Sequence, residues 1–378
     1  MKKNKTKKNI LLVFGTRPEA IKMAPLFLAL KKNSNFDVRI CVTAQHREML
    51  DQVLEIFSIN PEFDLNIMSK GQSISQITAN VLEQLPKVFD NFMPDLLLVH
   101  GDTTTTFSAS LSSFNANIKV GHVEAGLRTG NIFQPWPEEA NRRLTSVLTQ
   151  LHFAPSKLSK ENLIKEGIDE ETIFVTGNTV IDALFIALQK IKDNKDFVRG
   201  VNDEYPFLTE HKKIILVTGH RRESFGKGFE NICKALLKIS DEFEDLNIVY
   251  PVHLNPKVRE PVNKHLKDKQ NIHLIEPLDY LRFIYFMEKS SIILTDSGGV
   301  QEEAPSLNKP VIVMRNTTER PEALETGIVK LGGTNPEKIF SLLKQALQDI
   351  PVDEIKNPYG NGDSSIKIVK IIEDFLDN

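Results

Sequence analysis

Short apolar runs alternate with longer amphipathic segments along nearly the whole chain. Strands that alternate with helices predict βαβ units, because consecutive parallel strands need a crossover connection that is usually a helix. The pattern therefore predicts an α/β fold with a mostly parallel sheet. In the first half of the chain the apolar runs are residues 10–14, 38–42, 95–99, 118–123, 151–154 and 172–175.

The same alternation restarts in the second half of the chain. It follows a charged and aromatic linker, and the new apolar runs are residues 213–219, 247–252, 271–275, 291–296 and 311–314, with the linker at about 193–212. A chain of 378 residues also exceeds the about 100–200 residues of a single domain. We expect two doubly wound, Rossmann-like domains that face each other across a cleft. Their predicted limits are residues 1–177 and 178–361, with a C-terminal helix at 362–378 that crosses back to the first domain.

Composition argues against several classes of protein. The formal net charge is −3, which argues against a general binder of nucleic acid or of a membrane surface. No apolar stretch approaches the about 18–20 residues that a membrane span requires. Cys41 and Cys233, the only cysteines, each lie in an apolar segment and offer neither a disulfide framework nor a zinc site. We expect a cytoplasmic protein that binds a small molecule.

An acid and four threonines follow the third apolar run, in the segment HGDTTTTFSASL at residues 100–111. In doubly wound sheets ligands bind beyond the carboxyl ends of the strands, which places Asp102 among the candidate functional residues. Asp102 could instead be the N-cap of a helix that begins near Thr103, with the threonines satisfying free backbone amides. The pattern leaves both interpretations open.

Further carboxylates follow the next predicted strand. Glu124 lies in GHVEAGLRTG, and Glu138 and Glu139 lie at the start of a helix in QPWPEEANRR. Glu124 could merely pair with Arg128, and the helix dipole alone favours an acid at position 138. Taken together with Asp102, these carboxylates indicate acid/base chemistry at one edge of the sheet.

Cations are candidates for binding an anion in both domains. Arg17 and Lys22 begin the helix after the first strand, where the alternative is two solvated side chains. In the second domain the turn TGHRRESFGKG places His220 beside two arginines, and RNTTERPEA contributes Arg315 and Arg320. His220 could be only a cap residue, but neighbouring cations favour a phosphate site.

The segment DSGGVQEEAPSL at residues 296–307 predicts a phosphate site. Ser297, Gly298 and Gly299 form a turn that lets backbone approach a ligand closely, and the helix after it points its amides outward. Glu303, about one turn into that helix, could accept both hydroxyls of a ribose. The alternative is a glycine-rich turn before a surface helix. The spacing of the glycines differs from the dinucleotide fingerprint, so no NAD site is expected.

These motifs together resemble the non-hydrolysing UDP-N-acetylglucosamine (UDP-GlcNAc) 2-epimerases of bacteria. The resemblance covers nearly the whole chain, and its segments occur in the family's order. They are FGTRPEAIKMAP, VTAQHREML, HGDTTTTF, GHVEAGLRTG, PEEANRR, FVTGNT, HRRE, YPVHLNP, LTDSGGVQEEAPSLNKPV and TTERPEA.

The resemblance implies a fold, an activity and a set of site residues. The fold is the two-domain glycosyltransferase-B architecture, and the activity is interconversion of UDP-GlcNAc and UDP-N-acetylmannosamine (UDP-ManNAc) for surface polysaccharide. It implies acid/base roles for Asp102, Glu124 and Glu138, and a role for His220 at the diphosphate. It also implies nucleotide contacts from Arg17, Lys22, Phe283, Ser297, Gly299, Glu303 and Arg320. A homodimer is expected.

Chemistry explains why such a site needs several carboxylates. The C2 proton of the sugar is not next to a carbonyl, so direct removal would leave an unstabilised carbanion. If UDP leaves C1 first, the C2 proton becomes acidic and a carboxylate can take it to give 2-acetamidoglucal. Inversion then needs acid/base groups on both faces of C2, and the pattern does not assign a carboxylate to a face. Neither NAD nor a metal takes part in this route, so no cofactor is expected.

Rival functions share the fold. A hydrolysing epimerase would release free ManNAc and UDP, a glycosyltransferase would pass the sugar to an acceptor, and a third rival is a non-catalytic nucleotide-sugar binder. A transferase needs no acid/base group at C2, which argues against it.

The resemblance also implies an activator site for a second UDP-GlcNAc, formed by Gln45, His46, Arg221 and His253. At two positions of that site, where relatives can carry a glutamine and an arginine, this chain has Glu48 and Gly71, so we expect weak activation.

Overall fold

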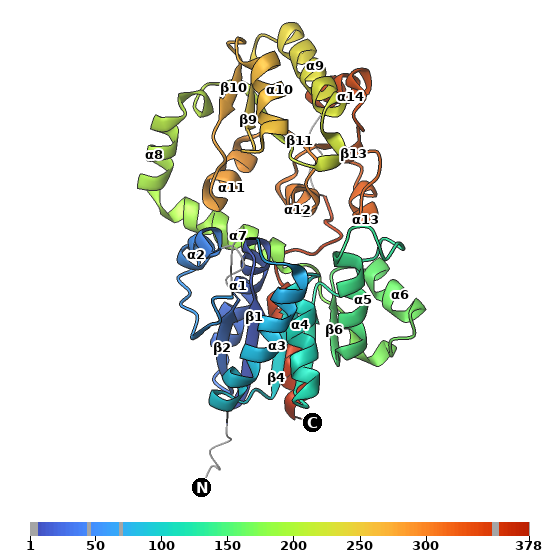
Figure 1. Cartoon of the computed structure of the whole chain (residues 1–378). Coiled ribbons are helices and arrows are strands. Elements are labelled where there is room, and N and C mark those ends of the chain that lie inside the picture. The colour runs from blue at the N-terminus through green and yellow to red at the C-terminus, as the bar shows by residue number, and fades with distance from the viewer. Residues whose placement is uncertain (1–6, 44–46, 68–70, 350–354, 378) are drawn as a thin grey trace. The chain divides into compact units, whose positions relative to one another are not determined.

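The computed structural model describes residues 7–43, 47–67, 71–349 and 355–377. The chain divides into two compact units (Figure 1). The N-terminal unit is Met1–Ala183 together with Tyr359–Asn378, and the C-terminal unit is Leu184–Pro358. Each unit contains one sheet, and all strand pairs are parallel.

The N-terminal sheet has seven strands in the order β3-β2-β1-β4-β5-β6-β7. The order reverses between β1 and β4, and such a switch point leaves a crevice beyond the carboxyl ends of the two strands. The strands are β1 Lys8–Phe14, β2 Phe36–Val42, β3 Phe63–Asp64, β4 Leu96–His100, β5 Lys119–Val123, β6 Leu151–Ala154 and β7 Ile173–Val175.

Helices connect these strands. Thr16 begins α1 with a capping box, in which its side chain and that of Glu19 satisfy each other's backbone N–H groups. The C-terminal helix α15 packs against α1, and Asn33 and Asn35 donate to Glu373 on it. The helices are α1 Arg17–Lys31, α2 Arg47–Ile56, α3 Ile74–Asn91, α4 Thr104–Asn115, α5 Glu138–Leu148, α6 Lys157–Lys165 and α15 Ser364–Asp377. Helix α7, Thr179–Asp193, begins in this unit and continues into the C-terminal unit.

The C-terminal sheet has six strands in the order β10-β9-β8-β11-β12-β13, with its switch point between β8 and β11. The strands are β8 Lys213–Thr218, β9 Leu246–Pro251, β10 Ile272–Ile275, β11 Ile292–Thr295, β12 Val311–Val313 and β13 Val329–Leu331. The predictions of an α/β fold and of two doubly wound parallel sheets are therefore confirmed.

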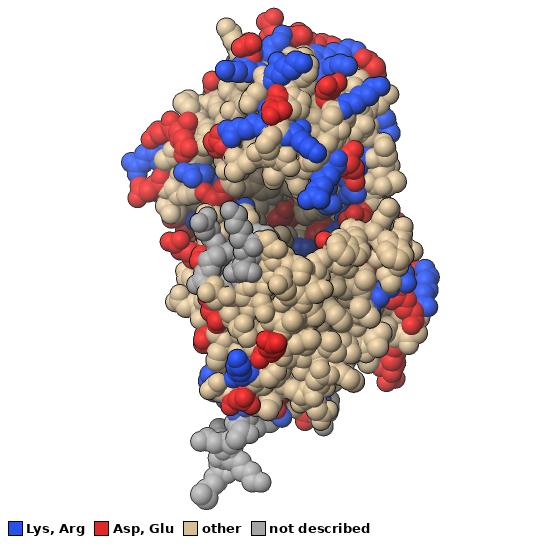
Figure 2. Space-filling model, viewed as in Figure 1, with Lys and Arg blue, Asp and Glu red and all other residues tan. Residues whose placement is uncertain are grey.

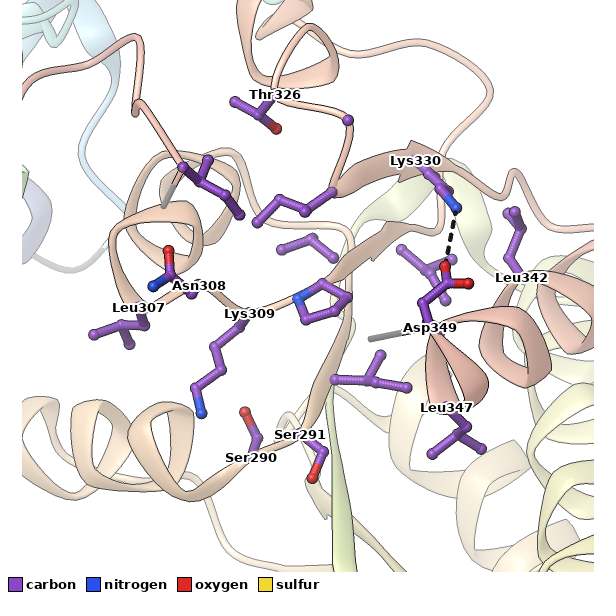
Figure 3. A pocket seen from close by; sticks show the side chains of 18 of the residues that line it. Ser290, Ser291, Leu307, Asn308, Lys309, Thr326, Lys330, Leu342, Leu347 and Asp349 are labelled. Carbon is purple, nitrogen blue, oxygen red and sulfur yellow. Dashed lines mark ion pairs between the residues drawn. The ribbon is translucent and has the colours of Figure 1, made fainter. Parts of the chain in front are cut away.

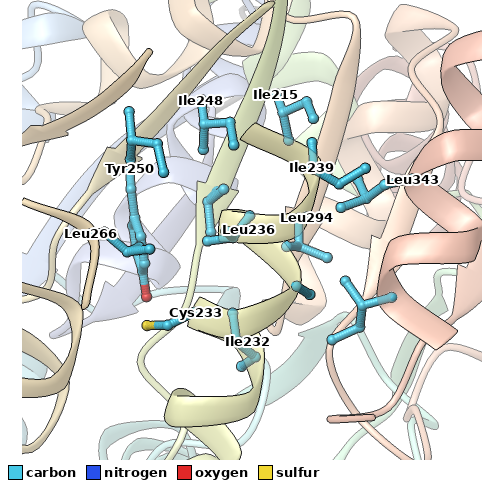
Figure 4. Packing of buried hydrophobic residues seen from close by; sticks show 14 of the residues in the cluster. Ile215, Ile232, Cys233, Leu236, Ile239, Ile248, Tyr250, Leu266, Leu294 and Leu343 are labelled. Atoms are coloured by element: carbon cyan, nitrogen blue, oxygen red, sulfur yellow. The ribbon is translucent and has the colours of Figure 1, made fainter. Parts of the chain in front are cut away.

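The core of the C-terminal unit lies between this sheet and its helices. Figure 4 shows Leu236 and Ile239 of α9 beside Ile215 and Ile248 of the sheet, and all four are fully buried. The helices are α8 Lys195–Glu204, α9 Lys227–Glu242, α10 Pro256–Leu266, α11 Tyr280–Lys289, α12 Gly298–Glu303, α13 Pro321–Leu324 and α14 Pro336–Gln348. Within the described ranges, no helix combines the length and apolar character that a membrane span requires.

Three elements differ from the sequence prediction. The edge strands β3 and β13 have two and three residues, which is too short to show a period in the sequence. The predicted linker contains the helix α8, whose N-cap is Asn194. This segment has many charged residues and few apolar positions, of which Phe197 and Val201 are spaced one turn apart, so the sequence did not indicate a helix.

Candidate active site

Thr103, not Asp102, begins helix α4. The Thr103 hydroxyl accepts from the Thr106 backbone N–H at 3.1 Å, so the alternative that Asp102 is the N-cap is wrong. The Thr103 hydroxyl also donates to Glu19 Oε1 at 2.8 Å, and that of Thr106 donates to the His100 carbonyl at 2.5 Å. The threonines therefore hold the turn, and the Asp102 carboxylate is left available for another task.

Glu19 joins the starts of α1 and α4. Its carboxylate accepts from the backbone N–H groups of Gly15 at 3.1 Å and of Thr16 at 2.7 Å, besides the Thr103 hydroxyl. Burial raises the pKa of Glu19, and hydrogen bonds from Thr16 and Thr103 oppose the rise. Gly15 is required here, because a Cβ would lie 2.0 Å from the Thr43 hydroxyl. Sequence reasoning did not single out Glu19, although it lies in the FGTRPEA segment.

Asp102 lies among charged groups at the carboxyl end of β4. Its carboxylate accepts from Arg142 at 3.1 Å, and its carbonyl accepts from the Asn141 side chain at 2.9 Å. Burial raises the pKa of Asp102, Arg142 opposes the rise, and the charges of Glu124 and Glu138 add to it. The three predicted carboxylates therefore share one electrostatic environment in the N-terminal unit.

Glu124 directly follows β5 in a left-handed backbone conformation, with φ of 64°. Its carboxylate contacts the ammonium group of Lys22, accepts from the Asn178 side chain at 2.7 Å, and lies 3.8 Å from His100 Nε2. A non-glycine residue in this conformation is uncommon and marks a position that its surroundings hold in place. The Lys22 ammonium group and the Asn178 amide are among the groups that hold Glu124 in place.

Two alternatives for these residues are wrong. Arg128 does not pair with Glu124, since its guanidinium binds Glu166 at 2.8 Å. Lys22 is not a solvated cation, since its side chain is 11% exposed and contacts Glu124. Arg17 is the first residue of α1 and half-buried, and its anion-binding role stays a prediction.

The adjacent acids at the start of α5 differ in their surroundings. Glu139 is fully buried, accepts from the Thr129 backbone N–H at 3.1 Å, and pairs with Arg142 and Arg143 at 3.3 Å. Glu138 is half-buried, and its Oε2 is covered without a hydrogen-bond partner among the described residues. Glu139 therefore has a structural role, whereas Glu138 keeps an oxygen that a ligand could use.

Two buried histidines support this edge and were not predicted. Burial lowers the pKa of His100 to about 4, with Glu124 opposing the shift. Burial also lowers the pKa of His122 to about 3, and its Nε2 lies 2.7 Å from the carbonyl oxygen of Gly101. Both rings are therefore neutral at pH 7 and add no positive charge next to the carboxylates.

Asp296 organises the corresponding edge of the C-terminal unit. Its Oδ2 accepts from the backbone N–H groups of His220 at 2.7 Å and Arg221 at 2.8 Å, and its Oδ1 lies 3.3 Å from His220 Nδ1. Burial lowers the pKa of His220, and Asp296 opposes that shift. The His220 ring is 46% exposed and stacks on His253, with 5.7 Å between the ring centroids. A buried acid therefore holds an accessible histidine.

The Ser297–Gly299 turn follows β11 and begins helix α12. A Cβ on Gly298 would meet nothing nearer than 3.7 Å, and one on Gly299 nothing nearer than 3.8 Å. Neither glycine has a positive φ. The unit's own packing and backbone therefore do not require glycine at either position, which fits the predicted close approach of a ligand.

Arginines surround the acids near this turn. Arg320 contacts the fully buried Glu302, and Arg315 donates to Glu223 at 2.6 Å. Burial alone would raise the pKa of Glu319, but Arg221, Arg315 and Arg320 lower it. Arginine side chains therefore gather at this edge of the C-terminal unit, where acids hold them in place.

The other predicted residues are placed as follows. Glu303 is buried at the end of α12, and Phe283 is half-buried on α11. Arg221 is half-buried and His253 is exposed. Gln45 and His46 lie outside the described residues. Asn141, Arg142 and Asn178 were not assigned roles from the sequence, although PEEANRR and FVTGNT contain them.

Comparison with known proteins identifies the family. A model of the UDP-N-acetylglucosamine 2-epimerase family matches residues 28–373. The UDP-N-acetylglucosamine 2-epimerase of Yersinia pestis is 56% identical over 368 residues, which are 96% of this chain and 98% of that protein. That of Escherichia coli K12 is 53% identical over 368 residues, with the same shares covered.

Solved structures agree with these relatives. The UDP-GlcNAc 2-epimerase from Neisseria meningitidis bound to UDP-GlcNAc is 52% identical, with a TM-score of 0.90 over 98% of this chain and 100% of that one. A glycosyltransferase from Rickettsia africae is 17% identical, with a TM-score of 0.63 over 98% and 99%, and shares the fold alone. The chain therefore belongs to the UDP-N-acetylglucosamine 2-epimerase family.

Proposed function

We propose that this chain is an epimerase that interconverts UDP-GlcNAc and UDP-ManNAc without hydrolysing either. The observation that carries the proposal is the shared environment of Asp102, Glu124 and Glu138, in which the charges of Glu124 and Glu138 raise the pKa of Asp102. Family membership supports the substrate, because the Neisseria relative was solved with UDP-GlcNAc.

The proposed reaction begins with departure of UDP from C1. Loss of the diphosphate makes the C2 proton acidic, and one carboxylate removes it to form 2-acetamidoglucal. A second carboxylic acid then protonates the opposite face of C2, and UDP adds back to C1. No atom is gained or lost overall, since the proton that leaves one face is replaced on the other.

Burial raises the pKa of Asp102 from its ordinary value towards neutral pH, and a group transfers protons best when its pKa lies close to the working pH. Arg142 positions Asp102 and limits that rise. Glu124 contacts Lys22 and accepts from Asn178 in addition. Lys22 and Asn178 therefore hold the Glu124 carboxylate in place beside Asp102.

The C-terminal unit is proposed to bind the uridine diphosphate. Ser297, Gly298 and Gly299 would approach a phosphate with their backbone N–H groups, and Arg320 would add positive charge. α12 has only six residues, so these N–H groups matter more than a helix dipole. His220, held by Asp296, would stabilise the leaving diphosphate. Glu303 would accept from the ribose, and Arg17 and Phe283 would complete the nucleotide contacts.

We also propose a homodimer that forms through α4 and α5. Figure 2 shows few charged side chains over this part of the N-terminal unit. Phe114 is 57% exposed on α4, and Leu144 and Val147 are 48% and 76% exposed on α5. Neighbouring apolar side chains of this size on exposed helix faces are typical of interfaces between subunits. The mass in solution, measured by light scattering, tests this.

The identity of the products tests the function. Purified protein with UDP-GlcNAc should form UDP-ManNAc until the two reach equilibrium, with only traces of free UDP and glucal. The reaction should proceed without added NAD and in the presence of EDTA. Proton NMR distinguishes the outcomes: stoichiometric free ManNAc would establish the hydrolysing reaction instead. A reaction only after addition of a sugar acceptor would establish a glycosyltransferase.

The product UDP-ManNAc is an activated donor, so we propose that it supplies ManNAc units for surface polysaccharide.

A further inference from the structure

A cavity of about 790 Å³ lies at the amino-terminal edge of the C-terminal sheet (Figure 3). Lys213 begins β8, Ser291 precedes β11 and Pro310 precedes β12, and all three line the cavity. Asp296 and Ser297 follow the carboxyl end of β11, so they lie at the opposite edge of the same sheet. The cavity is therefore separate from the candidate nucleotide site, and its volume falls within the about 300–1,000 Å³ of small-molecule pockets.

The walls of the cavity are largely apolar. α14 contributes one wall and the starts of β11 and β12 contribute another. Apolar walls of this kind bind the body of an organic molecule rather than a bare ion. The apolar side chains include Ile292, Leu307, Val311, Ile328, Leu342 and Leu347.

Positive charge predominates around these walls. Among the described residues that line the cavity, the charged ones are Lys213, Lys289, Lys309, Lys330 and Asp349. Lys213 Nζ donates to the Leu347 carbonyl at 2.6 Å, and Lys330 Nζ lies 3.9 Å from Asp349 (dashed in Figure 3). Among the described lining residues, four lysines therefore stand against one aspartate, which pairs with Lys330.

Lys309 is the lysine of this lining whose ammonium charge is least balanced by nearby acids or hydrogen-bond acceptors. It is half-buried, and no hydrogen bond or ion pair to its ammonium group occurs within the described part of the chain. Burial lowers the pKa of Lys309, and Glu288 opposes that shift only in part. A partly buried ammonium group without a partner destabilises the folded state, and a bound anion would relieve this.

We infer that this cavity binds an organic anion with an apolar body, whose charged group pairs with Lys309. The apolar walls would contact the body, and Ser291, which also lines the cavity, offers a hydroxyl donor. Inorganic phosphate lacks the apolar body and should bind at least about tenfold more weakly than a ligand that fills the cavity.

A fluorescent probe tests the inference directly. Titration with 8-anilinonaphthalene-1-sulfonate, an apolar body with one sulfonate, is carried out on the full chain with saturating UDP to occupy the nucleotide site. Lys309→Gln removes the pairing charge and should weaken binding about tenfold or more. Ala346→Phe keeps every charge but fills the cavity from α14, and should weaken binding as much. Lys264→Gln removes an exposed lysine of α10 and is the matched control.

Three results would overturn the inference. They are equal affinity in wild type, Lys309→Gln and Ala346→Phe, an equal loss in Lys264→Gln, and equal binding of the neutral analogue N-phenyl-1-naphthylamine. Far-UV circular dichroism checks that Ala346→Phe folds, and if it does not, Lys309→Gln decides the matter alone. Turnover of UDP-GlcNAc without probe should be unchanged in Lys309→Gln, because the cavity lies at the other edge of the sheet.

Discussion

The carboxyl edges of the two sheets share a topology but present different chemistry. In the N-terminal unit the acid after β4, Asp102, faces the side-chain cation Arg142. In the C-terminal unit the acid after β11, Asp296, accepts from the backbone N–H groups of His220 and Arg221. An acid held by backbone amides orders a loop, whereas an acid paired with a side-chain cation can keep an oxygen for proton transfer. The group that holds each acid, a side-chain cation at Asp102 and backbone amides at Asp296, therefore distinguishes the chemistry of the two edges.

The pKa directions at the two edges differ in the same way. Burial dominates at Asp102 and raises its pKa, although Arg142 opposes the rise. At Glu319, burial would raise the pKa, but three arginines outweigh it and lower the pKa. The first edge thus brings a carboxyl group closer to neutral titration, and the second keeps its acid ionised among cations. We assign proton transfer to the first edge and anion binding to the second.

The largest expected effect is a loss of turnover, without loss of UDP binding, in variants of the N-terminal edge. Asp102→Asn, Glu124→Gln and Glu138→Gln should each reduce kcat by about 10²-fold or more, because each removes a proposed acid/base group. UDP binding by calorimetry should survive, since the C-terminal unit is proposed to hold the nucleotide. Glu161→Gln, an exposed acid of α6, is the matched control. Near-wild-type turnover in any one of the three variants would remove that residue from the mechanism.

Glu303→Ala should instead weaken UDP binding and change turnover less. Loss of a charge-assisted hydrogen bond corresponds to about 1.5–3 kcal/mol, so the Kd of UDP should rise by roughly 10- to 150-fold. At saturating substrate kcat should fall much less than in the carboxylate variants. Glu325→Ala, an exposed acid after α13, provides the comparison. An unchanged Kd would refute the assignment of Glu303 to the nucleotide.

A smaller effect should appear in the pH profile. Arg142 lowers the pKa of Asp102 against the effect of burial, so Arg142→Met should raise that pKa further. The acid limb of kcat/KM should then move to higher pH, because Asp102 acts as a base only when ionised. Arg142→Lys keeps a positive charge and should restore most of the original limb. An acid limb that does not move in Arg142→Met would show that Asp102 does not set it.

The smallest effect concerns activation by a second UDP-GlcNAc. Gly71 has no side chain to offer a diphosphate, and Glu48 is an anion where the family resemblance implies a neutral donor. We therefore expect nearly hyperbolic dependence of rate on UDP-GlcNAc, and a reverse reaction that proceeds without added UDP-GlcNAc. Strong sigmoidality, or an absolute requirement for UDP-GlcNAc in the reverse direction, would contradict this.

The sequence predicted the elements that position the site, because strand periodicity and turn residues are local signals. Asp102, Glu124 and Glu138 were singled out as candidates because each follows a strand or starts a helix. The partners Arg142 and Asn178 were not, since their contacts with Asp102 and Glu124 cross 40 and 54 residues. Such pairings depend on the packed arrangement of the strands.

The N-cap of α4 shows the limit of local reasoning. Both Asp102 and Thr103 are good N-cap residues, and propensity does not choose between them. The choice is made by Glu19, which accepts from Thr103 across 84 residues. The buried histidines His100 and His122 were overlooked for the same reason, since only the folded sheet places them beneath the turn.

Incorporation of solvent deuterium at C2 tests most directly whether the carboxylates at the N-terminal edge transfer the C2 proton. The reaction is run in D₂O with UDP-GlcNAc and followed by proton NMR. If a carboxylate removes the C2 proton after UDP departs, the UDP-ManNAc formed should carry deuterium at C2, and Asp102→Asn, Glu124→Gln and Glu138→Gln should slow its incorporation by about 10²-fold or more. UDP-ManNAc that retains the original C2 proton would contradict elimination and re-addition, and with it the acid/base role assigned to the N-terminal edge.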